Sequence, residues 1–431
     1  MSEQKNFINY HVLISHSPSC LNRDDQNMQK RAVFGGVERI RISSQSLKRA
    51  MRKPPENAAN YWLSCGVLGE PSLRTRSFDK ITDKLIDKLH EEFKDDELVR
   101  QTTIMFVKAR KQQEADDVAE DSIGEEMEDN APNKTPVAPW VIEEIKALCA
   151  VIQAAKEKGL TDEERQKALK NVGKEVGKKN NKRKLTEKDC LDEALMKKIL
   201  KEIENSSDKI KQAAGSAVDL ALWGRMATSG LMTSVDGSLA VAHAITTHAA
   251  QADTDWFTAV DDLVQDSGEV GAGHLDTQEF SSGVFYRYAS LNIMQLQKNL
   301  GGATRERALE IAKHVFHMLC TVVPSAKQQS FAAHNPADFA IVTFDDQPIS
   351  LANAFERPVE TEKNSGYLMP SIHELMAYHE RMKKVYGLGK TAVAAPKDIG
   401  ANFPDGLKML ETFPEVENWI IKDGPSTAIK E

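Results

Sequence analysis

A short predicted helix near the N-terminus places four polar side chains on one face. The segment is SSQSLKRAMR, residues 43–52, and it contains no acidic residue. At about 100° per residue, three cations and one amide fall within roughly a third of the circumference. They are Gln45, Lys48, Arg49 and Arg52. Such side chains contact phosphodiester oxygens in many complexes. The segment therefore predicts a surface for a nucleic-acid backbone, and an ordinary solvated helix face is the alternative.

The surroundings of this helix strengthen the first interpretation. Ser43 and Ser44 supply N-cap side chains, and the free N–H groups at a helix start attract anions. The preceding loop adds the cations Arg23 and Lys30. The apolar side chains of the opposite face, which we expect to pack on a sheet, are Leu47, Ala50 and Met51.

Other residue types that support chemistry occur without the required spacing. His314 and His317 stand three residues apart, but neither HExxH nor a CxxC pair occurs, and the five cysteines are widely scattered. We therefore predict no metal and no cofactor, and we interpret both residues as structural. His243 and His248, near the end of a predicted strand, are interpreted in the same way.

The charges of the 431-residue chain form opposed blocks. The formal net charge of −8 by itself argues against a nucleic-acid binder. Residues 20–53, however, hold nine basic and three acidic residues, an excess of six positive charges. Residues 114–129 hold nine acidic residues and no basic one, which predicts a surface loop, whereas residues 165–188 hold ten basic and two acidic. The Lys-rich block is either a solvated insertion or an arm that contacts nucleic-acid phosphates.

Hydrophobic periodicity predicts an α+β protein. Alternation predicts a half-buried strand over 7–16 and further strands over 237–247, 284–293 and 339–344. Helical patterns cover 81–107, 140–155 and 189–223, and an apolar helical stripe covers 308–319. Ser371 and Glu374 form a predicted capping box that begins a helix ending near Tyr386. Strands at both ends of the chain thus enclose a large helical insertion.

Several segments resemble one protein family. FINYHVLISHSPSCLNRDD, the following FGG and RISSQSLKRAMR are similar to the N-terminal signature of the CasC family, the backbone subunit of the type I-E CRISPR Cascade complex. The similarity continues in ALWGRMATSGLMT at 221–233, VDGSLAVAHAITTHAA at 235–250 and HLDTQEFSSGVFYRYASLNI at 274–293. These segments follow the order of the family. The similarity is weakest in the two charged blocks and after about Pro358.

The resemblance implies a hand-like architecture. It implies a discontinuous RRM-like, ferredoxin-type palm at 1–60 and 225–431, with a long thumb β-hairpin at 253–285. A mostly helical fingers insertion at 61–224 would contain the acidic loop, 114–129, and the Lys-rich block, 165–188. The expected fold class is therefore α+β, with palm, fingers and thumb in one subunit.

The resemblance also implies a function, that of a non-catalytic backbone subunit in antiviral defence. Such subunits stack head to tail as a helical filament on the crRNA, grip its sugar-phosphate backbone, displace bases at regular intervals and present the guide to target DNA. Position by position, the residues implied in the palm are Arg23, Lys30, Gln45, Lys48, Arg49 and Arg52. Those implied beside the displaced base are Met226, Phe257, Thr258 and Leu275. Core packing is the alternative role for Met226, Phe257 and Leu275.

Two further classes of function stay open. A related backbone subunit of type III complexes cleaves RNA with a loop aspartate, and Asp24 or Asp25 could recruit Mg²⁺ in that way. The alternative is that these aspartates cap their own loop or bridge to Arg23. The second class is a protein-only scaffold, which would contain no nucleic acid.

Partners and location follow from the same resemblance and from the composition. The expected partners are crRNA, target DNA, further copies of the chain, and the large, small, foot-end and crRNA-processing subunits of Cascade. No apolar run reaches the roughly 18 residues of a membrane span, and the N-terminus has no signal-peptide pattern. We therefore expect a cytoplasmic ribonucleoprotein with no membrane contact.

Overall fold

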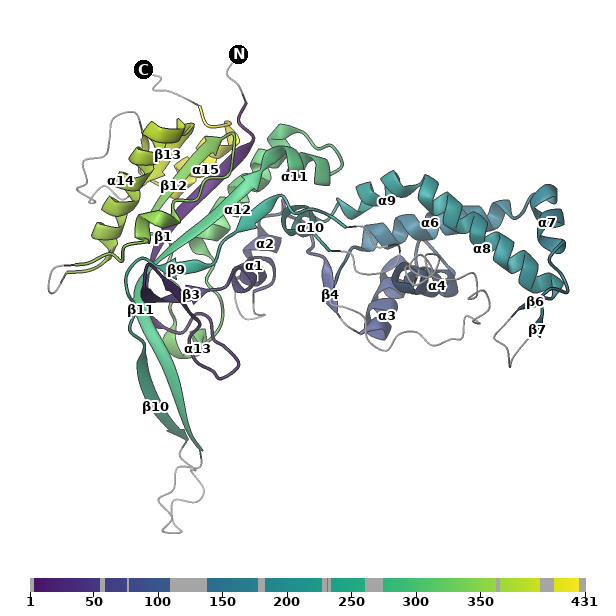
Figure 1. Cartoon of the computed structure of the whole chain (residues 1–431), viewed down its shortest axis with the longest axis horizontal. Coiled ribbons are helices and arrows are strands. Elements are labelled where there is room, and N and C mark those ends of the chain that lie inside the picture. Colours follow the sequence, from purple (N-terminus) through teal and green to yellow (C-terminus); the bar gives the residue numbers. More distant parts are fainter. Residues whose placement is uncertain are drawn as a thin grey trace, which may run out of the picture. The chain divides into compact units, whose positions relative to one another are not determined.

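The computed structural model describes residues 4–54, 59–75, 77–108, 138–176, 183–226, 231, 234–259, 274–361, 365–395 and 407–425, with the side chains of 107, 108, 138, 176, 257–259 and 274–276 outside this description. The chain divides into two compact units (Figure 1). Unit 1 comprises Met1–Gly69, Ser238–Gln297 and Ala303–Glu431, and unit 2 comprises Glu70–Gly237 and Lys298–Gly302. The predicted palm and fingers boundaries at 60 and 225 remain a prediction.

A mixed sheet forms the centre of unit 1. Its strands are β1 (Phe7–Ser19), β2 (Arg31–Phe34), β3 (Val37–Ile42), β8 (Leu239–Val241), β9 (Ala244–Thr246), β10 (Asp253–Ala259), β11 (His274–Asn292), β12 (Phe339–Asp345), β13 (Lys390–Ala394) and β14 (Lys408–Leu410). The order is β14-β13-β12-β1-β11-β9-β3-β2, while β8 and β10 also pair with β11. Neighbours are antiparallel except β13 and β14. The predicted α+β class, with a large and mostly antiparallel sheet, is confirmed.

Helices cover both faces of the central strand β1. The helices of unit 1 are α1 (Ser44–Arg52), α2 (Tyr61–Ser64), α11 (Ile293–Asn299), α12 (Arg305–Thr321), α13 (Gln328–Phe331), η2 (Ala352–Phe355), α14 (Leu368–Tyr386) and α15 (Phe413–Ile421). On one face the Tyr10 hydroxyl donates to the Ala312 carbonyl of α12 at 3.1 Å. On the other face Leu13 packs in one apolar cluster with Ile372 of α14.

The prediction that β1 is half-buried is therefore wrong. Asn9 and His11, expected to face solvent, are 0% and 1% exposed. Burial, aided by the nearby His379, lowers the pKa of His11 to about 3, so the ring is neutral. Its Nδ1 lies 2.8 Å from the Tyr286 hydroxyl. Hydrogen bonds satisfy these polar side chains and so allow them to be buried under α14. The alternation within the strand does not show that a helix covers its second face.

The apolar stripe predicted over 308–319 is confirmed in α12. All its members are buried: Ala308, Leu309, Ala312, Val315, Phe316 and Leu319. The capping box predicted at Ser371 and Glu374 is wrong, because α14 already begins at Leu368. Ser371 is inside the helix, where its hydroxyl donates to the Tyr367 carbonyl at 2.6 Å.

Unit 2 is mostly helical. Its elements are β4 (Leu73–Thr75), α3 (Phe78–Leu89), α4 (Asp96–Lys108), β5 (Ala138–Trp140), α6 (Ile142–Lys158), α7 (Asp162–Leu169), β6 (Glu175–Val176), β7 (Arg183–Lys184), α8 (Glu187–Asn205), α9 (Ser207–Ala214) and α10 (Val218–Trp223). Helical character over 81–107, 140–155 and 189–223 is confirmed, but the first stretch is two helices and the last is three. An apolar core that includes Leu85, Ile145 and Ile203 joins them. Within the described residues of both units, no helix is long and apolar enough to span a membrane.

We expect the aromatic packing beneath α12 to dominate the stability of unit 1. Phe316 is 0% exposed and lies 6.3 Å from Tyr10 and 6.0 Å from Phe413, measured between ring centroids. Phe316→Ala should lower the free energy of unfolding by about 3–5 kcal/mol, because it leaves a cavity. Lys313→Ala, on the same helix, should change it by no more than about 0.5 kcal/mol. Urea denaturation measures both, and equal effects would contradict this packing argument.

Candidate nucleic-acid interface

Helix α1 has the two faces that the sequence predicts. Leu47, Ala50 and Met51 are 0%, 8% and 2% exposed, so the apolar face is buried. Ser43 is the N-cap residue, and its hydroxyl accepts from the Ser46 amide at 3.3 Å. On the opposite face Gln45 and Arg49 are exposed and Lys48 is half-buried. The helix thus presents an amide and cations to solvent, as a phosphate-binding face requires.

The start of α1 differs from the expectation of free N–H groups. The Ser43 amide donates to the Asn22 side-chain oxygen at 2.8 Å, and the Ser44 amide donates to Nδ1 of His243 at 2.9 Å. The Ser46 amide is taken by the cap. These three donors are satisfied within the protein. A ligand at this surface must therefore rely mainly on side chains rather than on the helix terminus.

Asn22 joins the preceding loop to the same helix. Besides its side-chain bond to the Ser43 amide, its carbonyl accepts from the Lys30 amide at 2.9 Å. The Lys30 carbonyl in turn accepts from the Arg41 amide at 2.9 Å. The loop, the helix start and strand β3 are thereby held together, so the cations on all three lie in one region of unit 1.

The loop residues Arg23 and Asp24 are engaged with their own loop. Arg23 is exposed, and its guanidinium donates to the Asn27 side-chain oxygen at 2.6 Å. The Asp24 carboxylate accepts from the Gln26 amide at 2.9 Å and from the Met28 amide at 3.0 Å. This is the loop-capping role that the sequence left as an alternative to metal binding. Among the residues that the structure describes, no group of three His, Cys, Asp or Glu side chains could hold a metal ion.

Lys30, Arg41 and His243 converge beside the start of α1. Burial, together with the positive charges of Arg41 and Lys30, lowers the pKa of His243 below its usual value. His243 is exposed, and its Nδ1 accepts from the Ser44 amide, a contact that agrees with its interpretation as a structural histidine. His248 also has a structural role. It is 4% exposed, and its ring nitrogens lie 2.9 Å from the Ala249 carbonyl and 3.3 Å from the Val284 amide.

Two other arginines near α1 are buried. Arg39 is 0% exposed and donates to the carbonyls of Thr246 at 3.1 Å and Phe355 at 2.9 Å, so its role is structural. Arg52, expected on the polar face of α1, is 8% exposed and offers little surface to a ligand. We define the basic surface by seven exposed or half-buried residues of this region: Arg23, Lys30, Arg41, Gln45, Lys48, Arg49 and His243.

The other predicted contact residues lie on a β-hairpin and in unit 2. In the β10–β11 hairpin Thr258 pairs with Leu275 and Phe257 with Asp276, and the side chains of these four residues lie outside the described part of the structure. Trp256, which the sequence analysis did not select, is 66% exposed on β10. Its position next to Phe257 in the sequence DWF could have indicated it as a further candidate contact residue.

Met226 is strongly exposed and follows a buried ion pair. It is 84% exposed, which excludes a role in core packing. The preceding Arg225 forms two hydrogen bonds of 2.7 Å with the Glu144 carboxylate, and both side chains are 0% exposed. Gly224 adopts φ +72°, and a Cβ there would lie 2.5 Å from the Val235 carbonyl oxygen. Glycine and the ion pair therefore fix the backbone immediately before Met226.

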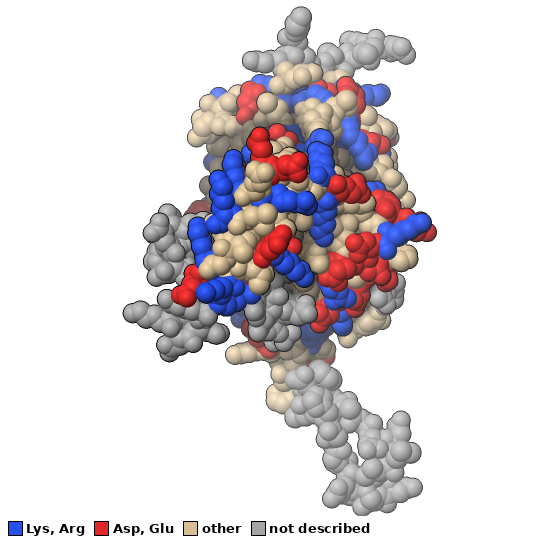
Figure 2. All heavy atoms as spheres, turned by 90° about the vertical axis from the view of Figure 1, so that its right-hand side faces the viewer, with Lys and Arg blue, Asp and Glu red and all other residues tan. Residues whose placement is uncertain are grey.

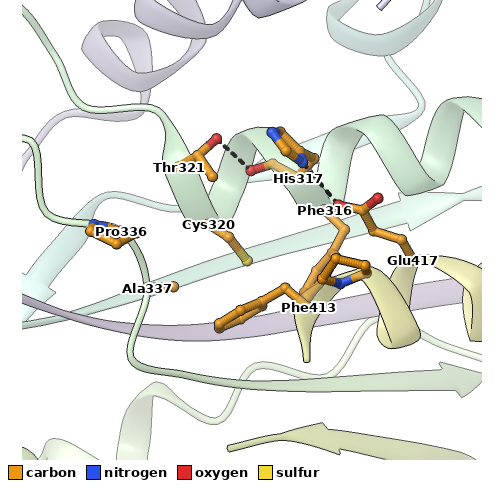
Figure 3. Close-up of a pocket in the computed structure, with 9 residues that line it drawn as sticks. Phe316, His317, Cys320, Thr321, Pro336, Ala337, Phe413 and Glu417 are labelled. Carbon is orange, nitrogen blue, oxygen red and sulfur yellow. Dashed lines mark hydrogen bonds and ion pairs between the residues drawn. The ribbon is translucent and has the colours of Figure 1, made fainter. Parts of the chain in front are cut away.

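The pair His314 and His317 is structural, as the sequence predicts. Nδ1 of His314 lies 2.7 Å from the Tyr61 hydroxyl. Nδ1 of His317 lies 2.8 Å from the Glu417 carboxylate (Figure 3). A cavity of about 100 Å³ adjoins His317, with Phe316, Cys320 and Phe413 in its lining (Figure 3). Ligand sites usually occupy about 300–1,000 Å³, so this cavity is too small for a nucleotide.

The charged insertions belong to unit 2 by sequence. Cations of the Lys-rich block and its neighbourhood are paired, Lys198 with Glu164 at 2.8 Å and Arg183 with Asp189 at 3.7 Å. Figure 2 shows basic and acidic side chains interspersed over the visible face. Residues 177–182 of this block and the whole acidic loop, 114–129, lie outside the described residues. The contact of this block with nucleic acid remains a prediction.

Comparison with known proteins assigns the family. The family model described as CT1975-like protein, a Cas family, matches residues 8–419. The chain belongs to the CT1975-like Cas family. Among curated proteins, none matches the chain.

Solved structures show the same fold. One chain of a "CRISPR RNA-guided surveillance complex, pre-nicking" is 26% identical, with a TM-score of 0.66, over 97% of this chain and 100% of that chain. A chain of a "CRISPR RNA-guided surveillance complex" is 21% identical, with a TM-score of 0.54, over 96% and 98%. The similarity spans both units, so this CT1975-like chain shares a complete subunit fold with its relatives rather than one domain.

The buried Arg225–Glu144 pair generates a stability prediction. Glu144→Ala leaves an uncompensated guanidinium in the interior and should lower the free energy of unfolding by about 3–5 kcal/mol. Glu143→Ala is the control, because Glu143 is exposed and lies 3.9 Å from Lys146. An exposed pair of this kind contributes at most about 1 kcal/mol. Urea denaturation compares the variants, and a Glu144 effect as small as that of Glu143 would contradict the assigned role of the pair.

Proposed function

We propose that this chain is the guide-RNA-binding backbone subunit of a type I-E CRISPR Cascade complex, the CasC branch. Membership of a Cas family and whole-length similarity to a chain of a CRISPR RNA-guided surveillance complex support the proposal. The basic surface around α1 is the observation that carries it. Its lysines and arginines all lie within residues 20–53, which hold six more basic than acidic residues although the chain as a whole is acidic.

The basic surface suits a ligand whose sequence varies. A guide-binding subunit must accept every spacer, so it needs contacts to phosphates rather than to base edges. Arg49 is exposed and Lys48 half-buried on α1, and the loop adds Arg23 and Lys30. Lys and Arg side chains bind phosphates regardless of the base attached. Base pairing between the guide and target DNA would then supply the sequence specificity.

The sheet topology supports an RRM-like palm with an altered binding face. With the intervening elements left out, β1, α1, β9, β11, α12 and β12 follow in the chain in the order of a ferredoxin-like βαββαβ unit, and the sheet order β12-β1-β11-β9 is consistent with that proposal. RRM domains stack bases on aromatic side chains of the open sheet face. Here α12 and α14 pack against the central strand, and Tyr10 and Tyr286 are 0% and 2% exposed. The guide is therefore proposed to lie on the basic surface rather than on the sheet.

The same proposal assigns base displacement to the hairpin and to Met226. Met226, Phe257, Thr258 and Leu275 would stand beside the displaced base. The 84% exposure of Met226 supports this role, because an exposed apolar side chain can unstack a base without identifying it. The pairing of Thr258 with Leu275 supports it as well, since both belong to one position of the hairpin.

We further propose that the subunit is not a nuclease and that it functions in the cytoplasm. Its partners would be crRNA, target DNA, further copies of itself head to tail in a filament, and the large, small, foot-end and crRNA-processing subunits. The engagement of the Asp24 carboxylate with two amides of its own loop supports the non-catalytic role. The alternative is metal-dependent cleavage of the type III kind by Asp24 or Asp25.

Charge reversal on α1 tests guide binding. Lys48→Glu with Arg49→Glu, co-expressed with guide RNA and the remaining subunits, should remove co-purifying RNA, since it replaces attraction to phosphates by repulsion. Absorbance at 260 and 280 nm and extraction of the RNA measure the result. Lys383→Glu with Lys384→Glu on α14 changes the net charge equally and should leave the RNA content unchanged. Undiminished RNA in the α1 variant would reject the assignment of the basic surface.

Incubation with a metal ion distinguishes the proposed non-catalytic subunit from a subunit that cleaves RNA. The guide in the purified complex should stay full length after prolonged incubation with Mg²⁺, as judged on a denaturing gel. Cleavage that is abolished by Asp24→Asn or Asp25→Asn would instead favour the type III kind of activity.

A further inference from the structure

We infer that His243 is a guide contact of the basic surface, donating its Nε2–H to a phosphate oxygen of the RNA while its Nδ1 holds the first turn of α1. This inference rests on the proposed function. It deepens that function by adding a neutral hydrogen-bond donor to the cations already assigned.

The tautomer of His243 follows from its backbone contact. The Ser44 amide donates to Nδ1 at 2.9 Å, so Nδ1 must be the nitrogen without a proton. A neutral imidazole carries one N–H, which is therefore on Nε2. Because Nδ1 accepts the Ser44 N–H, the ring is held in one orientation and its Nε2–H points in a fixed direction.

The surroundings keep the ring neutral and favour an anionic ligand. Burial and the charges of Arg41 and Lys30 lower the pKa of His243, so the imidazolium is disfavoured. A second proton would also have to enter at Nδ1, where it would replace the bond from the Ser44 amide. His243 is exposed, lies near the charges of Arg41 and Lys30, and is bonded to the first residue of α1. A phosphate attracted by them meets the Nε2–H without the cost of ordering a flexible chain.

The contact also explains how the start of α1 can contribute to phosphate binding although its amides are already hydrogen-bonded. The Ser44 N–H, one of the donors that a helix terminus would offer to an anion, is given to His243. The ring presents an equivalent donor farther from the backbone. Five other histidines of unit 1 are at most 5% exposed, namely His11, His16, His248, His314 and His379, whereas His317 is half-buried and His334 and His373 are exposed.

Two substitutions at one position separate contact from positioning. His243→Asn keeps an acceptor close to the position of Nδ1 and removes the Nε2 donor, whereas His243→Ala removes both. Anisotropy with a fluorescent single-stranded RNA of guide length measures the Kd of the full chain, and thermal unfolding monitors the fold. If His243 contacts phosphate, the Asn variant should bind about tenfold or more weakly, near the Ala variant, because a bond to a charged acceptor is lost. Wild-type affinity of the Asn variant would overturn the inference.

The remaining outcomes are also decisive. If the Asn variant folds poorly, NMR of the ¹⁵N-histidine-labelled wild-type chain tests the contact instead, through the side-chain nitrogen resonances. A shift of the His243 Nε2 resonance on RNA addition is expected, and an unchanged resonance in the bound state would overturn the contact. Lys48→Glu with Arg49→Glu is measured in parallel. If that variant binds RNA like the wild type, the proposed function fails. If it loses RNA while His243→Asn does not, only the histidine contact fails.

Discussion

The burial of β1 on both faces is the constraint on which the remaining structure depends. This strand pairs with β11 and β12 along most of its length, so it fixes the register of the sheet. Tyr10 bonds to α12 on one face, and Leu13 packs with residues of α14 on the other. Neither face is left for a ligand, and polar groups such as Asn9 and His11 are used to satisfy the interior. The proposed binding residues therefore lie on loops and on α1.

Electrostatics follows from this division between interior and surface. Arg39 and Arg287 are 0% and 1% exposed, and both donate to backbone carbonyls, so they complete hydrogen bonding inside the protein. Burial lowers the pKa of Arg287 to about 10, which shows the cost of placing a guanidinium there. Lys30, Lys48 and Arg49 keep access to solvent instead. The number of cations near α1 thus overstates the number available to a phosphate.

The sequence predicts well what depends on neighbours in the chain. The periodicity and cap of α1 place Leu47 inside and Arg49 outside, and both assignments agree with the structure. The hydrogen bond between His243 and the Ser44 amide could not be predicted, because the two residues are 199 positions apart in the chain. For the same reason the alternation in β1 indicated a half-buried strand. The helix that covers its second face begins only at Leu368. Local patterns cannot show which distant element supplies a partner or a cover.

The hydrogen bonds of Asn22 have a consequence for the entropy of binding. Its side chain holds the Ser43 amide and its carbonyl holds the Lys30 amide, so the loop and the helix start cannot open independently. Flexible loops lose conformational freedom when a ligand orders them, and that loss subtracts from affinity. Here the freedom is lost during folding. An assembly with many copies of such a subunit along one polymer would avoid this loss of conformational freedom at every copy.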